Sequence, residues 1–214
     1  MSQNLSDVKD LWGDDRYQDF ISHQAVGSFR EFIQYLYKEM DRAISNVEEN
    51  KHYLFRSGED LITAFIVTFL KGCKIMAEHD SNSNGNPDIK VEWYDYTWLA
   101  EAKIVNSNYE AMEGWRQLVN RYSSGSPKQR TGGVLLYLLD GKTTETMKSW
   151  REYLSDAENV ELHIEECRLN QLCFFSQHEN EVSGLYHCIR HMPVNLTFKP
   201  TDKSARSSKK HNAN

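Results

Sequence analysis

Three of the charged side chains in the strand-like segment NPDIKVEWYDYTWLAEAKIV (residues 86–105) have types and spacing that could do chemistry. They are Asp88, Glu101 and Lys103. Because strand side chains alternate, Glu101 and Lys103 point to the same face. Two charges on one face of a buried strand are costly unless they are paired, solvated or bound to a metal. Carboxylate oxygens are ligands that Mg²⁺ prefers, so metal-assisted chemistry is one of three possibilities.

The elements that must position these side chains are predicted from the spacing of the apolar residues. Helices are expected at about 26–44 and over a nearly all-apolar run at 61–70, followed by a loop at 78–85. Further along we expect strands at about 88–93 and 98–105, a helix at 108–122, a basic loop, a strand at 134–139, a helix at 144–155, and strands at about 159–167, 171–177 and 194–199. This order predicts an α/β fold with a central mixed sheet flanked by helices.

The residues Pro87-Asp88 and Glu101-Ala102-Lys103 together resemble the PD-(D/E)XK motif of the restriction-endonuclease-like nucleases. The resemblance covers roughly residues 55–155. It includes a helix before the hairpin, a helix after it, a buried strand and a further helix. In that family the helix before the hairpin often carries a glutamate facing the site, here Glu59. The helix after it often carries a polar residue, and here it bears Gln117 and Tyr122.

The resemblance implies a restriction-endonuclease-like core with an extra N-terminal helix and extra C-terminal strands. We therefore expect an N-terminal helical extension over residues 1–54, a nuclease-like domain over residues 55–198, and a basic, disordered tail over residues 199–214.

The resemblance also implies a metal-dependent hydrolysis of phosphodiester bonds, in which Mg²⁺ or Mn²⁺ activates a water and neutralises charge in the transition state. The candidate metal ligands are Asp88, Glu101, Glu59 and the backbone carbonyl of Ala102. Lys103 would orient or deprotonate the attacking water. Substrate contacts are expected from the segment 103–130, whose local net charge is +3. The candidates for these contacts are Gln117, Arg121, Lys128 and Arg130.

Each of these residues also has a structural alternative. Glu101 and Lys103 could form a solvated ion pair on an edge strand. Asp88 follows Pro87, where an aspartate is a common turn residue. Glu59 lies in the first turn of a predicted helix, where the helix dipole favours a carboxylate.

A second group of possible ligands lies closer to the C-terminus: Cys167, Cys173, His187, Cys188 and His191. The four-residue spacing of the histidines is one that zinc sites use on helices. The first two cysteines are six residues apart rather than in a CxxC pair, so buried thiols facing each other across a hairpin, with surface imidazoles, are the alternative. Four aromatic residues could stack on nucleic-acid bases or pack the hairpin against the core: Trp93, Tyr94, Tyr96 and Trp98.

Composition and charge limit the class of protein. The 214-residue chain has a net charge of -6, although its last 16 residues carry five basic residues and one acidic residue. The acidic remainder does not suit a long nucleic-acid footprint without help. No apolar run reaches the roughly 20 residues of a membrane span, and the acidic start MSQNLSDVKDLWGDD is unlike a signal peptide. With only four cysteines, we expect a cytoplasmic protein with free thiols and no membrane association.

The sequence therefore predicts a hydrolase, a Mg²⁺-dependent endonuclease. The resemblance to the PD-(D/E)XK family implies DNA rather than RNA as the substrate. Its acidic body favours work alongside a protein partner, such as a helicase or ATPase subunit. The resemblance further implies the nuclease subunit of an antiviral (anti-phage) defence assembly. Two alternatives remain open: a catalytically inactive adaptor that keeps the fold and binds a partner protein, and a zinc-stabilised interaction module.

Overall fold

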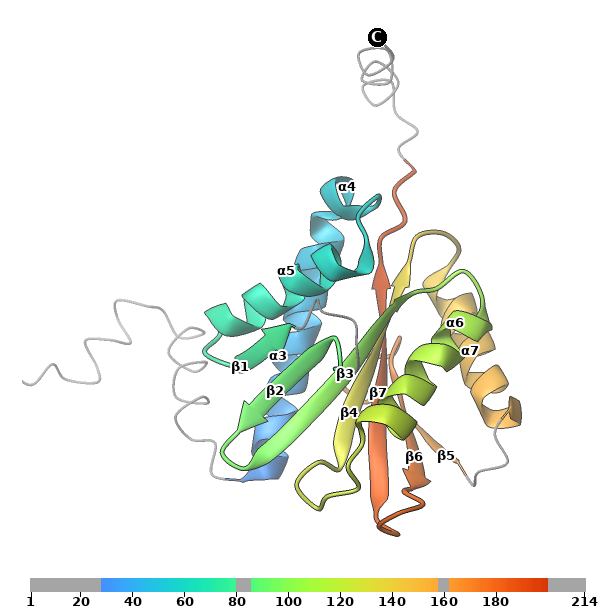
Figure 1. Cartoon of the computed structure of the whole chain (residues 1–214). Coiled ribbons are helices and arrows are strands. Elements are labelled where there is room, and N and C mark those ends of the chain that lie inside the picture. Colours follow the sequence, from blue (N-terminus) through green and yellow to red (C-terminus); the bar gives the residue numbers. More distant parts are fainter. Residues whose placement is uncertain (1–27, 80–85, 158–161, 200–214) are drawn as a thin grey trace, which may run out of the picture.

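The computed structural model describes residues 28–79, 86–157 and 162–199 (Figure 1). The described strands form one mixed sheet in the order β1-β2-β3-β4-β7-β6-β5. In chain order the elements are α3 (Phe29–Glu49), α4 (Lys51–Leu54), α5 (Glu59–Gly72), β1 (Met76–His79), β2 (Ile89–Trp93), β3 (Tyr96–Ile104), α6 (Asn108–Arg116), the π-helix η1 (Gln117–Tyr122), β4 (Thr131–Leu138), α7 (Thr143–Ala157), β5 (His163–Glu166), β6 (Phe174–Glu179) and β7 (Tyr186–Asn195). The predicted α/β fold with a mixed sheet flanked by helices is confirmed.

The strands at the centre of the sheet are paired in parallel, and those on either side are antiparallel to their neighbours. β1, β2 and β3 form an antiparallel meander, β3, β4 and β7 run parallel, and β6 and β5 are antiparallel to their neighbours. β2 begins at Ile89, which pairs with Ala100, whereas β3 continues along β4 as far as Ile104. The last residues of β3 therefore run past the start of β2, and no strand among the described residues lies beside that edge of β3 there.

Helices cover both faces of this sheet, and each face builds its own core. Trp98, Ala100 and Ala102 of β3 face a core shared with α3 and α5, while Leu99 faces a core shared with α6, η1 and α7. Figure 1 shows these two helix layers on either side of the strands. The alternation puts Glu101 and Lys103 on the side of α6. Within the described ranges, no helix combines the length and apolar character that a membrane crossing requires.

α3 shows how local sequence sets an element in place. Ser28 caps its start, accepting a hydrogen bond from the Glu31 N–H at 3.3 Å. Apolar residues at helical spacing, among them Leu36 and Met40, are then fully buried against the sheet. The described part of the predicted N-terminal extension thus shares a core with the strands. Residues 1–27 and the tail from residue 200 onward lie outside the described residues.

Three predicted strands differ from the structure, and two strands, β1 and β7, were not predicted. β1 was not predicted, because the region from Glu78 reads as the start of a loop; residues 80–85 of that loop lie outside the described residues. The strand predicted at 194–199 is wrong, since β7 occupies Tyr186–Asn195. The predicted strands at 159–167 and 171–177 correspond to the shorter β5 and the shifted β6. β7 escaped prediction because buried polar residues, including Arg190 and His191, interrupt its apolar pattern.

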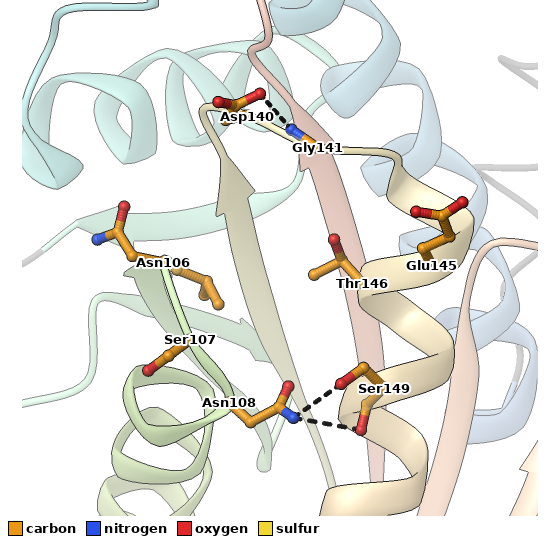
Figure 2. A pocket seen from close by; sticks show the side chains of 9 residues that line it. Asn106, Ser107, Asn108, Asp140, Gly141, Glu145, Thr146 and Ser149 are labelled. Carbon is orange, nitrogen blue, oxygen red and sulfur yellow. Dashed lines mark hydrogen bonds between the residues drawn. The ribbon is translucent and has the colours of Figure 1, made fainter.

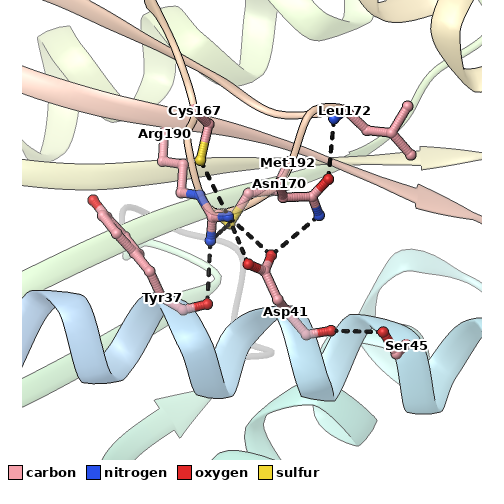
Figure 3. A network of polar contacts seen from close by, with 8 residues as sticks. All are labelled: Tyr37, Asp41, Ser45, Cys167, Asn170, Leu172, Arg190 and Met192. Carbon is pink, nitrogen blue, oxygen red and sulfur yellow. Dashed lines mark hydrogen bonds and ion pairs between the residues drawn. The ribbon is translucent and has the colours of Figure 1, made fainter.

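Arg190 is the most deeply buried charge in the described structure, with a side chain that is 0% exposed. Its Nη2 donates to both carboxylate oxygens of Asp41 on α3, at 2.9 and 2.8 Å, and its Nη1 donates to the Tyr37 carbonyl at 3.3 Å (Figure 3). The guanidinium also lies 4.9 Å from the centre of the Tyr37 ring. Nη2 reaches the Cys167 thiol at 3.6 Å. This network ties α3 to the centre of the sheet.

Removal of the Asp41 carboxylate should therefore destabilise the protein strongly. Asp41→Ala leaves the buried Arg190 cation without its counter-charge, and we expect a loss of roughly 3 kcal/mol or more in the free energy of unfolding, measured by urea denaturation. Lys142→Ala is the matched control, because it breaks an exposed ion pair with Glu145 and should cost less than about 1 kcal/mol. Equal losses in the two variants would show that Arg190 is solvated rather than dependent on Asp41.

Candidate active site

Two carboxylates occupy the edge of β3 that β2 leaves open. Asp88 Oδ2 accepts a hydrogen bond from the Ala102 N–H at 2.7 Å, and Glu59 Oε1, at the start of α5, accepts one from the Ile104 N–H at 3.0 Å. The N–H and C=O groups of a strand residue point to the same edge. The carbonyl of Ala102 therefore faces the same open edge, between the N–H groups that Asp88 and Glu59 satisfy.

Glu101 and Lys103 join this group from the next positions of the same strand. Lys103 Nζ donates to Glu101 Oε1 at 2.8 Å and lies 3.8 Å from Glu59 Oε2. The side chain of Glu101 is only 4% exposed, whereas those of Lys103 and Glu59 are 21% and 36% exposed. Asp88, Glu101, Lys103 and Glu59, predicted from the sequence as one site, are thus in one place. We call them the carboxylate–lysine group.

Burial and mutual repulsion shift the protonation of this group. Burial and the nearby charge of Asp88 raise the pKa of Glu101 to about 7, although the hydrogen bond from Lys103 opposes the shift. Burial also raises the pKa of Asp88, against the opposing effects of the Ala102 N–H and Lys103. Burial acts to lower the pKa of Lys103, but its hydrogen bond to Glu101 and the surrounding carboxylates raise that pKa overall. A carboxyl that titrates near neutral pH is typical of functional sites.

One atom of the group fits a cation. Glu101 Oε2 is buried and has no hydrogen-bond donor among the described residues. A buried carboxylate oxygen without a partner is unfavourable, and a divalent ion would satisfy it. In the described part of the chain, no three Asp, Glu, His or Cys side chains are already gathered closely enough to enclose an ion. Asp88 and Glu59 each direct one oxygen to a backbone N–H instead.

Neighbouring residues that the sequence did not single out hold the group in shape. Gly114 of α6 lies against Lys103: a Cβ there would be 2.9 Å from Lys103 Cγ. The Thr63 hydroxyl donates to the Glu59 carbonyl at 2.9 Å and shares a 2.7 Å hydrogen bond with the Tyr137 hydroxyl. A glycine inside an amphipathic helix was the available signal for Gly114. The buried run VLLYLL, in which Tyr137 is the one hydroxyl, gave no comparable indication.

The predicted substrate-binding residues do not all join the group. Gln117 begins η1, one turn after Gly114, and its Oε1 is buried without a described partner. Arg121 lies over the ring of its neighbour Tyr122, 6.0 Å from the ring centre. Lys128 pairs with Asp95 at the turn between β2 and β3.

Lys128 and Arg130 lie at the opposite end of the sheet from the carboxylate–lysine group. The Lys128 carbonyl accepts from the Thr97 N–H at 3.0 Å, and Thr97 precedes Glu101 by about 13 Å of strand. Arg130 Nε donates to the Tyr186 carbonyl at 3.2 Å. The structure therefore does not bring the basic loop together with the carboxylate–lysine group.

The predicted zinc ligands are divided between the two faces of the sheet. Cys167 and Cys173 are buried free thiols opposite each other across the β5–β6 turn, as the alternative predicted, and they belong to the core under α3. His187 and His191 are on β7 rather than a helix, and they are buried rather than at the surface. His191 is packed on the other core, where its two nitrogens bind Trp150 and Ser176.

The aromatic residues of the hairpin largely serve packing. Trp98 is fully buried. Trp93 stacks on Phe32 of α3, with ring centres 5.2 Å apart, and Tyr96 stacks on Phe29 at 4.3 Å. Tyr94 alone of the four is highly exposed, at 85%.

A cavity of about 730 Å³ lies at the carboxyl ends of β3 and β4, immediately after the strand residues that carry Lys103 (Figure 2). Apart from Val105 and Gly141, its lining consists of amides, hydroxyls and carboxylates, with no lysine or arginine. The residues shown are Asn106, Ser107, Asn108, Asp140, Gly141, Glu145, Thr146 and Ser149. Ligands of open α/β sheets commonly bind beyond the carboxyl ends of the strands. This lining suits a neutral polar group better than a phosphate.

Comparisons of the chain with family models, with curated proteins and with solved structures found no match. The sequence motif, the strand geometry and the shifted pKa values are therefore the observations from which a function is inferred.

The raised pKa of Glu101 makes stability depend on pH. Its pKa rises from an ordinary value of 4.5 to about 7 in the folded protein, so the stabilisation is full below pH 4.5 and is lost as pH rises through 7. A shift of this size corresponds to about 3 kcal/mol. Relative to Glu101→Gln, which cannot titrate, the parent should lose up to that amount between pH 4.5 and pH 8 in urea unfolding. A difference that stays constant across this range would contradict the raised pKa.

Gly114→Ala should disturb Lys103 without unfolding the protein. Alanine suits a helix better than glycine, but its Cβ would displace the Lys103 side chain from Glu101. Because Lys103 holds the pKa of Glu101 down, we expect that pKa to rise above 7 in a carboxyl NMR titration. Gly72→Ala is the control, since its Cβ would meet nothing within 4 Å. An unchanged Glu101 titration in a folded Gly114→Ala protein would mean that Gly114 does not position the lysine.

Proposed function

We propose that the chain is a metal-dependent nuclease of the PD-(D/E)XK type, cleaving phosphodiester bonds in DNA. The observation that supports it most is the convergence of Asp88, Glu101, Lys103 and Glu59 around one open strand edge. The order of a helix, a hairpin, a second helix, a buried strand and a third helix agrees with the restriction-endonuclease-like core that the motif implies.

The residues of the group fit a divalent ion with oxygen ligands. Glu101 Oε2 has no partner within the described ranges, Asp88 and Glu59 each have an oxygen not used by a strand N–H, and the Ala102 carbonyl faces the same edge. Bound Mg²⁺ or Mn²⁺ would supply an activated water and neutralise charge on the phosphate. Lys103, held by Glu101 and Glu59, offers a proton-transfer group and a positive charge beside that water.

The charge distribution of the protein indicates that it works with a partner. The body of the protein is acidic, and the basic loop with Lys128 and Arg130 lies away from the carboxylate–lysine group. A nuclease of this kind needs a second protein to hold DNA over a longer footprint. We propose that a helicase or ATPase subunit holds the DNA, in a cytoplasmic assembly of the antiviral-defence type.

One observation favours the alternative of an inactive adaptor. Asp88 and Glu59 each satisfy a backbone N–H of β3, a structural role that requires no catalysis. In an adaptor these carboxylates would only cap the strand edge, and a partner protein would bind elsewhere on the fold.

Three substitutions separate the two functions. Lys103→Met should lower cleavage of single- or double-stranded DNA by at least about 100-fold, while leaving Mn²⁺ binding intact or tighter, because a nearby positive charge has gone. Asp88→Asn and Glu101→Gln should lose Mn²⁺ binding and cleavage together. Cleavage is assayed on DNA and on RNA of the same sequence, and Mn²⁺ binding is measured by calorimetry.

Lys128→Ala is the matched lysine control and should keep cleavage within about twofold, because it lies at the other end of β3. Each variant must first melt cooperatively like the parent. A parent protein that binds no Mn²⁺ would end the nuclease proposal and favour the adaptor. Full cleavage by Lys103→Met would remove the lysine from the mechanism.

A further inference from the structure

Two buried histidines outside the carboxylate–lysine group have ring nitrogens that no described residue hydrogen-bonds. His178 of β6 and His187 of β7 are 2% and 4% exposed. Both nitrogens of His178, Nδ1 of His187 and Nε1 of the adjoining Trp115 are buried without a hydrogen-bond partner among the described residues. Buried polar atoms are nearly always satisfied, so four orphaned atoms in one cluster require an occupant.

The two imidazoles are placed to share one ion. His178 and His187 are directly opposite each other in the β6–β7 register, so both side chains leave the same face of the sheet. Their ring centres are 5.5 Å apart. Two imidazoles that bind a tetrahedral ion through nitrogens at about 2.0–2.1 Å have ring centres roughly 5 Å apart. Trp115 lies against His178 with ring centres at 5.5 Å.

The hydrogen bonding of His187 favours a metal ligand. Its ring hydrogen-bonds the backbone of Thr131, which leaves Nδ1 as the nitrogen without a partner. Metal-binding histidines commonly donate the other ring N–H to a backbone carbonyl in this way. Both rings are buried, which favours the neutral imidazole, the form whose lone pair can bind a metal ion. His191, on the same face, has partners at both nitrogens and offers no lone pair.

We propose that His178 and His187 bind a borderline transition-metal ion of the Zn²⁺ class, with water completing the coordination. The Trp115 ring lies against His178, and its buried indole N–H, which has no partner among the described residues, would donate to such a water. The ion would fasten α6 to β6 and β7. This site is independent of the proposed nuclease activity, because hard Mg²⁺ prefers oxygen ligands and imidazole pairs prefer Zn²⁺.

The test measures bound zinc directly. Chelator-treated protein is dialysed against ZnCl₂, desalted, and analysed for metal by mass spectrometry and for melting temperature. We expect one equivalent of zinc and a raised melting temperature for the parent. Asp88→Asn, which alters the other proposed metal site, and His52→Gln, which removes an exposed histidine, should behave like the parent. His178→Gln and His187→Gln should bind zinc more than about tenfold more weakly and show no zinc-dependent shift in melting.

Each outcome decides the proposal. Equal zinc binding by His187→Gln and the parent would overturn it. So would a parent that binds no zinc at millimolar ZnCl₂, in which case enclosed water satisfies the orphaned nitrogens. If either glutamine variant fails to fold, Co²⁺ bound to the parent is examined instead. Visible ligand-field bands of nitrogen-bound Co²⁺ support the site, and a spectrum of oxygen ligation alone would overturn it.

Discussion

The candidate site depends on one mismatch in strand length. β3 extends past the first residue of β2, so two of its N–H groups face an edge where the described part of the chain places no strand. Unpaired backbone groups in a largely buried setting require partners, and Asp88 and Glu59 provide them. The same two hydrogen bonds bring the carboxylate of Asp88, which directly precedes β2, and that of Glu59, at the start of α5, to the edge where the Ala102 carbonyl lies. The extra length of β3 therefore accounts both for the open strand edge and for the carboxylates gathered beside it.

Much of this arrangement was predictable because it is local. The hairpin carrying Asp88, Glu101 and Lys103 has alternating side chains, and its two strands lie close to where the pattern placed them. Glu59 was predicted from its place at the start of a helix, in combination with the motif. What the pattern could not give was the fit between elements. Gly114 matters through a contact with Lys103 that only the packed structure reveals.

The parts that escaped prediction are those where polar residues are buried. Arg190 and His191 made β7 read as an irregular segment, yet both are fully buried and each hydrogen-bonds residues distant in sequence. The basic loop shows the converse limit. Lys128 and Arg130 gave the right charge for phosphate contacts, but the direction of β4 places them at the far end of the strands. Net charge along a sequence carries no information about which end of a sheet it will occupy.

The sheet ends in two very short strands, β1 and β5, of four residues each. Both include charged or titratable side chains: Glu78 and His79 in β1, and His163, Glu165 and Glu166 in β5. Short edges bearing charge disfavour the addition of another strand. Such edges work against edge-to-edge association of two copies. The side-chain surfaces of the helices and loops are therefore better suited than the sheet edges to determine which partner the protein binds.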